Sequence, residues 1–258
     1  MNTILLSALF ALGLFVGVLA CLRLGWRFGR KRLAELGEGG QAGLGALEGA
    51  VYGLMGLLIA FTFTGAATRF NERRDLITQQ VNAIGTAWLR LDLLDEGARP
   101  EVRELFRRYV DEQLEIGRTA SNPQARAEAV ARSTALQDQI WAKAIAAAKA
   151  DKSQPLATSL LPPLNGMFDI AGTRLLASRQ HPPPAIFVML GVLVLLSALM
   201  AGFGMAKAKR HSLLHLLGFA TVMALSVYLI LDLEFPRLGL VRIDAFDRAL
   251  IELRASMD

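Results

Sequence analysis

Residues 56–74 read GLLIAFTFTGAATRFNERR, a stretch that changes from apolar to charged sequence without a proline. The first part is apolar enough for the interior of a bilayer, whereas the last part carries Arg69, Arg73 and Arg74. Gly65 is the one glycine in its interior. Because we find no helix-breaking residue here, the stretch predicts a single helix that leaves a membrane and continues unbroken into water.

Four windows of the 258-residue chain are suited to crossing a membrane, for which about 20 apolar residues are needed. The second has about 17 residues, the lower limit for a span, so its length alone also fits a buried soluble helix. Because this window carries no charge between residues 61 and 67, we interpret it as a span. The four predicted spans cover residues 3–22, 51–67, 185–206 and 212–231.

The sequence between the second and third spans has the spacing of helices and few signals for strands. Prolines indicate helix starts at Pro100, after Asn122, and near Pro163. Before them, apolar residues at heptad spacing predict a helix with one face that needs a partner. These heptad residues are Phe70, Ile77, Val81, Ile84, Trp88 and Leu91.

These patterns predict an all-α membrane protein with four transmembrane helices and a helical extramembrane domain. We expect the first two transmembrane helices in residues 1–67 and the helical domain in residues 68–184. The last two spans are separated by about five residues, which predicts an antiparallel transmembrane hairpin over residues 185–231. Residues 232–258 are expected to pack on the helical domain.

The net charge of +5 is concentrated in two short basic segments beside predicted spans, residues 23–32 and 207–210. Basic clusters that flank membrane helices explain this charge more simply than nucleic-acid binding does. Because positive charge in short loops marks the cytoplasmic side, the N-terminus, the helical domain and the tail are predicted to lie outside the cytoplasm.

We find no constellation of residues that indicates catalysis. The single cysteine, Cys21, excludes an intrachain disulfide and a thiolate metal cluster. His211 and His215 are one helical turn apart but have no neighbouring Glu or Cys to complete a metal site. The sequence therefore predicts a protein that is not an enzyme, with no metal site and no cofactor.

The second predicted span carries two different stripes. Leu54, Leu57, Phe61 and Thr68 fall on a narrow stripe, with Thr64 at its margin. A neighbouring stripe of small residues would let another helix approach closely. Repeated around a symmetry axis, the bulky stripe would form a hydrophobic constriction, but it also fits the core of a four-helix bundle. The small residues are Gly53, Gly56, Ala60 and Ala67.

Residues 54–74, LMGLLIAFTFTGAATRFNERR, resemble the pore-lining helix of bestrophins and its continuation into their soluble helices. Residues 229–246, LILDLEFPRLGLVRIDAF, resemble a shortened form of the segment after the last span in that family. Nearly the whole chain resembles the bestrophin-like membrane proteins of bacteria, on GTAWLRLDLL at residues 85–94 and RLGLVRIDAFDRAL at residues 237–250.

The resemblance implies a homopentamer in the bacterial inner membrane, with lipid around it and a central pore for small inorganic anions. The second span would line this pore. The implied neck residues are Leu54, Leu57 and Phe61, and the implied vestibule residues are Thr64, Thr68, Arg69 and Arg73. Bestrophins hold their soluble helices in the cytoplasm, whereas the basic short loops of this chain predict the opposite side.

Two other functions remain open at this stage. A subunit of a pentameric proton-channel complex would also be helical, and Thr62 and Thr64 fit its threonine-lined span, but no predicted span contains an acidic residue. A scaffold or sensor that conducts no ions would instead use the heptad face of the helical domain to bind another protein.

Overall fold

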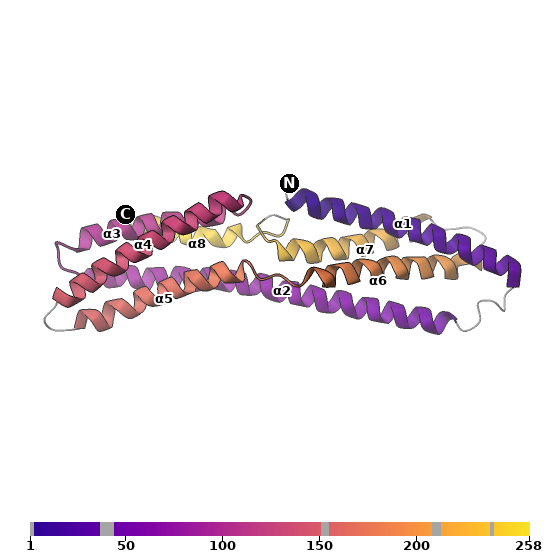
Figure 1. The fold of residues 1–258 in the computed structure, drawn as a ribbon, viewed down its shortest axis with the longest axis horizontal. Helices are drawn as coiled ribbons and strands as arrows, with labels where there is room; N and C mark the ends of the chain where they lie inside the picture. The colour runs from indigo at the N-terminus through magenta and orange to yellow at the C-terminus, as the bar shows by residue number, and fades with distance from the viewer. Residues whose placement is uncertain (1–2, 37–43, 151–154, 208–212, 238–239) are drawn as a thin grey trace. The chain divides into compact units, whose positions relative to one another are not determined.

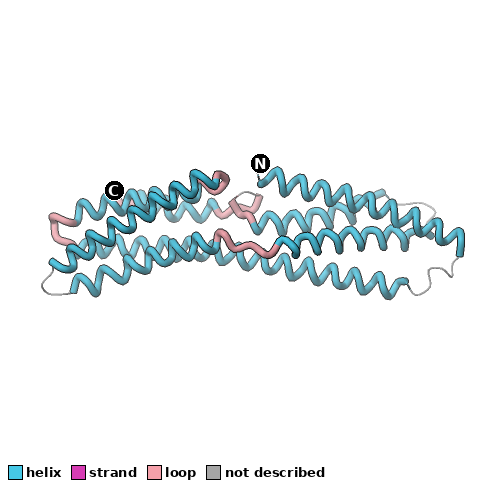
Figure 2. Tube along the Cα trace, viewed as in Figure 1, coloured by secondary structure: helices cyan, strands magenta, loops and turns pink. Residues whose placement is uncertain are grey.

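The computed structural model describes residues 3–36, 44–150, 155–207, 213–237 and 240–258 (Figure 1). Within these ranges every regular element is a helix, as Figure 2 shows, so the all-α prediction is confirmed. Four of the helices are long and apolar enough to cross a membrane, as predicted. The turn of the predicted hairpin, residues 208–212, lies outside the described residues.

The described residues form two compact units. The first comprises Met1–Arg69 and His181–Phe235, and we call it the membrane unit because it holds the apolar windows of the four spans. The second comprises Phe70–Gln180 and Pro236–Asp258, and we call it the helical unit.

Three helices belong wholly to the membrane unit: α1 (Thr3–Leu36), α6 (Pro184–Gly204) and α7 (Leu213–Glu234). The α1 helix packs against α6 and α7 and continues past its predicted span through the basic segment. Glycines let α1 and α6 approach closely, since a Cβ atom at Gly25 would collide with the backbone of Leu199 and one at Gly202 with the backbone of Leu22. Such contacts between small residues are a common means of packing helices within lipid.

The longest helix is α2 (Leu44–Arg90), whose 47 residues correspond to a length of about 70 Å. Residues 56–74 lie wholly inside it, so the predicted unbroken helix is confirmed. Residues 44–69 of α2 belong to the membrane unit, and residues 70–90 belong to the helical unit.

The remaining helices form the helical unit around one apolar core. They are α3 (Arg99–Arg118), α4 (Pro123–Ala150), α5 (Pro155–Ala177) and α8 (Asp244–Ala255), together with the short 3₁₀ helix η2 (Leu91–Leu93) that follows α2. A second 3₁₀ helix, η3 (Met205–Lys207), follows α6 and belongs to the membrane unit. The heptad face of α2 enters the core of the helical unit, because Ile84 is fully buried in it and Val81 and Trp88 pack against it; Leu91 of η2 is also part of the core. From α3, Phe106 and Tyr109 are fully buried.

The predicted start of the last helix of this region near Pro163 is wrong, because α5 begins at Pro155 and passes through Pro162 and Pro163. A proline inside a helix removes a backbone hydrogen bond and usually ends or kinks the helix. Leu160, Leu164 and Met167 of α5 are nevertheless fully buried in the core on both sides of the two prolines. Burial of this apolar face favours the helix despite the missing donors.

Candidate functional site

Five of the residues predicted from the sequence lie on one exposed face of α2. Leu54, Leu57 and Phe61 have 57%, 51% and 67% of their surface exposed, and Thr64 and Thr68 are exposed beyond them. Their alternating spacing of three and four residues places them on one side of a helix. We call this set the α2 stripe. In a single copy of the chain, these side chains are exposed.

Three of the four small residues beside the α2 stripe are exposed as well. A Cβ atom added at Gly53 or Gly56 would meet nothing within 4 Å, and Ala60 is also exposed. The most apolar window of α2 is only 11% buried, against 22% for α1, 33% for α6 and 22% for α7. Within the membrane unit, α2 is therefore the least enclosed of the four candidate spans.

Arg69 lies away from the α2 stripe and is held by a buried carboxylate. Its guanidinium donates to Oε1 of Glu234, from Nε at 2.8 Å and also from a terminal nitrogen. Glu234 is 1% exposed and also lies 3.5 Å from Nδ1 of His181, whose ring stacks on Phe235. A charge-assisted pair of this kind fixes the arginine in one orientation. Arg69 thus joins α2 to the end of α7.

Arg73 is buried in the helical unit, with 7% of its surface exposed. It donates to the backbone oxygens of Ala177 and Gln180, over 3.3 Å and 2.8 Å. Close to Arg73 along α2, the exposed charged side chains are acidic: Glu72 and Asp75. Of the seven predicted neck and vestibule residues, five therefore share one face, and the two arginines point elsewhere.

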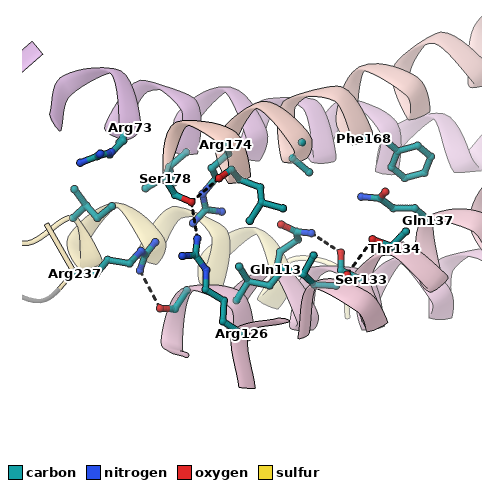
Figure 3. Close-up of a pocket in the computed structure, with 18 residues that line it drawn as sticks. Arg73, Gln113, Arg126, Ser133, Thr134, Gln137, Phe168, Arg174, Ser178 and Arg237 are labelled. Carbon is teal, nitrogen blue, oxygen red and sulfur yellow. Dashed lines mark hydrogen bonds between the residues drawn. The ribbon is translucent and has the colours of Figure 1, made fainter. Parts of the chain in front are cut away.

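A second cluster, which the sequence did not indicate, lines a cavity of about 150 Å³ in the helical unit (Figure 3). Four arginines reach this cavity: Arg73 from α2, Arg126 from α4, Arg174 from α5 and Arg237 from the segment that precedes α8. They are separated by about 50 residues or more along the chain, so no motif or spacing could have indicated that they meet.

One carboxylate bridges two of these arginines. Asp247 accepts from Arg237 at 2.6 Å and 3.0 Å and from Arg174 at 3.3 Å. Arg174 also donates to Gln80, which belongs to a buried chain of hydrogen bonds through Gln113 to Ser133. Burial, together with the charge of Arg237, lowers the pKa of Arg174 to about 10.

Of the four arginines, Arg126 has the fewest hydrogen bonds to offset the burial of its charge. Its terminal nitrogen donates to Oγ of Ser178 over 2.7 Å, while its buried Nε has no hydrogen-bond partner among the described residues. Burial, followed by repulsion from Arg237 and Arg179, lowers the pKa of this guanidinium. In the described part of the chain, no group of three or more His, Cys, Asp or Glu residues is placed to hold a metal ion.

Comparison with known proteins gives one match. A family model described as Bestrophin-like domain matches residues 41–245, which is most of the chain. The matched range covers α2 to α7 and extends to the start of α8. It includes the α2 stripe, all four arginines of the cavity and most of the helical unit. No curated protein and no solved structure matches the chain.

Proposed function

The chain belongs to the bestrophin-like family, and from this premise we propose that it forms an oligomeric membrane channel whose pathway is lined by the α2 stripe. The family name is associated with channels rather than with enzymes. The observation that carries the proposal is the exposure of α2, whose bulky apolar side chains Leu54, Leu57 and Phe61 are each more than half exposed in a single copy.

Association between copies follows from the small residues beside the stripe. Within lipid there is no hydrophobic force between helices, so association depends on close packing, which small residues permit. Gly53 and Gly56 have open space in front of them and would receive a helix of the next copy. In a ring of copies joined at this face, of which a homopentamer is the form we propose, the adjacent α2 stripe would point toward the axis.

A ring of Leu54, Leu57 and Phe61 would make an apolar constriction, which controls ion flow by excluding water. Thr64 and Thr68 lie one to two turns farther along α2 and would offer hydroxyl groups to ions that pass the constriction. We propose that the protein lies in the bacterial inner membrane and conducts small anions. This choice of ion rests on membership of the family and not on Arg69 or Arg73.

A second candidate, a pathway for cations, is favoured by the charges that α2 exposes. Arg69 is paired with Glu234 and Arg73 is buried, whereas Glu72 and Asp75 are exposed. Carboxylate rings attract cations in channels. Measurement of the reversal potential in a KCl gradient distinguishes the two, because its sign reports whether Cl⁻ or K⁺ carries the current. Loss of cation preference in a Glu72→Gln variant would assign the pathway to cations.

The channel is tested by ion flux into liposomes that contain the purified full-length chain. Phe61→Ala removes the most exposed apolar side chain of the α2 stripe, so flux should rise. The matched control is Phe63→Ala, which changes the same residue type on the opposite side of α2. Absence of flux would reject the channel and favour a scaffold or sensor that conducts no ions. Flux that is present but equal in all three proteins would reject the α2 stripe as the lining of the pathway.

A further inference from the structure

We propose that the arginine-lined cavity of the helical unit binds a small oxyanion, a phosphate or carboxylate group carried by a polar metabolite. This site is distinct from the α2 stripe and goes beyond the proposed channel function. We call it the arginine cavity and define it by Arg73, Arg126, Arg174 and Arg237 together with the polar residues across from them.

The charge of the arginine cavity favours an anion. Four arginines line the cavity, and among the described residues that line it none is acidic. Asp247 pairs with Arg174 and Arg237 from outside the lining. Arg126 and Arg237 repel each other strongly enough to contribute to the lowered pKa of Arg126. A cluster of this kind is stabilised by an anion placed between its members.

The hydrogen-bond donors of the arginine cavity favour an oxyanion. The Nε atom of Arg126 is buried without a hydrogen-bond partner among the described residues, which is costly for a charged group. Guanidinium groups present paired N–H donors that match the oxygens of a phosphate or carboxylate. A monatomic halide offers a single acceptor atom on which two such donors must converge, whereas an oxyanion offers a separate oxygen to each. The chemistry of the cluster therefore favours an oxyanion over chloride.

The size and the far end of the arginine cavity suit a molecule larger than a single ion. Its volume of about 150 Å³ is roughly ten times what a single water needs, so it has room for more than a bare ion. In Figure 3 the arginines gather toward one end, and Thr134, Gln137 and Phe168 line the other. These hydroxyl, amide and aromatic groups suit the uncharged body of a small polar metabolite.

Binding is tested on the purified full-length chain in detergent micelles, by thermal unfolding and isothermal titration calorimetry. The probes are inorganic phosphate and succinate, with NaCl at the same ionic strength as the control for screening. We expect phosphate or succinate to raise the unfolding midpoint in a saturable way, and chloride not to. A response to phosphate alone would assign a phosphate group, and one to succinate alone would assign a carboxylate.

Arg126→Gln is the informative variant. It should weaken oxyanion binding by about tenfold to a hundredfold, because one charge-assisted donor is removed. Without ligand it should leave the unfolding midpoint unchanged or raise it, because the repulsion from Arg237 and Arg179 is relieved. A merely structural arginine would behave in the opposite way, so that its loss would lower the midpoint. Arg108→Gln, which changes an exposed arginine of α3, should bind as the wild type does.

Val130→Phe provides a second variant that changes no charge. Val130 lines the cavity, so the larger ring should fill part of it and also abolish the oxyanion response. The proposal is overturned if neither oxyanion raises the midpoint of the wild type above the chloride control. It is equally overturned if Arg126→Gln and Val130→Phe both respond as the wild type does. These outcomes are independent of ion flux, so they leave the channel proposal to its own test.

Discussion

Two faces of the membrane unit carry glycines at the same spacing but have opposite surroundings. On α1, Gly25 and Gly29 are four residues apart and are buried against the backbone of α6. On α2, Gly49 and Gly53 are also four residues apart, and added Cβ atoms there would meet nothing within 4 Å. The glycine face of α1 is thus covered by another helix, whereas the glycine face of α2 has open space in front of it.

This difference identifies the glycine face of α2 as a surface of the membrane unit that is suited to packing but is left exposed in a single copy. Small residues at such spacing let helices approach closely in lipid, and the α1 face uses this property within a single copy. The α2 face, with Gly53, Gly56 and Ala60 exposed, has the same property and no partner from the described residues of its own copy. A second copy of the chain is the partner that our proposed function supplies.

The largest loss of stability is expected at Gly202, where another helix already packs against the glycine. A methyl group in Gly202→Ala would collide with the backbone of Leu22, which cannot rotate away as a side chain can. We expect the membrane unit to lose about 3 kcal/mol or more of stability. The measurement is unfolding of the detergent-solubilised chain by heat or by SDS.

The control for this prediction is Gly191→Ala on the same helix. A Cβ atom there would meet nothing within 4 Å, and alanine favours helix by about 1 kcal/mol over glycine. This variant should therefore be as stable as the wild type or slightly more stable. Equal stability of the two variants would mean that α1 and α6 are not closely packed, and the comparison of the two faces would then be invalid.

The second effect is expected at the open face, in assembly rather than in folding. Gly53→Leu places a bulky side chain where a neighbouring copy would pack, and nothing in its own copy is near it. The chain should keep its unfolding midpoint as a monomer but lose its oligomer. Native mass spectrometry of the detergent complex gives the number of copies directly.

Gly218→Leu on α7 is the matched control, because that glycine is also exposed and also has nothing within 4 Å. It should leave the number of copies unchanged. If Gly53→Leu also leaves it unchanged, or if the wild type is a monomer, the open face of α2 is a lipid-facing surface and the ring of copies is rejected.

The sequence predicts best those features that depend on residues near one another in the chain. The unbroken α2 helix follows from the absence of helix breakers in residues 56–74, and the shared face of Leu54, Leu57 and Phe61 follows from their helical spacing. Both features are local, so the pattern along the chain was sufficient to predict them.

The orientations of the arginines depend on distant partners and could not be predicted in this way. Arg69 is fixed by Glu234, which lies 165 residues away, and Arg73 by carbonyl groups more than 100 residues away. The arginine cavity is assembled from four separate segments for the same reason. The late start predicted for α5 failed because burial of Leu160 and Leu164 outweighs the local signal of two prolines.

The smallest effect is expected at Gly17, where the α1 face is filled by a side chain instead of a backbone. A Cβ atom at this position would lie 3.0 Å from Cδ2 of Leu195, which is able to move by a few tenths of an ångström. The gain of about 1 kcal/mol in helix propensity for Gly17→Ala offsets this strain, so the net change should be within about 0.5 kcal/mol. The same unfolding assay that is used for Gly202→Ala measures it. A loss as large as that of Gly202→Ala would show that α1 is held rigidly along its whole contact with α6, whereas a small change confines the tight packing to the region of Gly25 and Gly202.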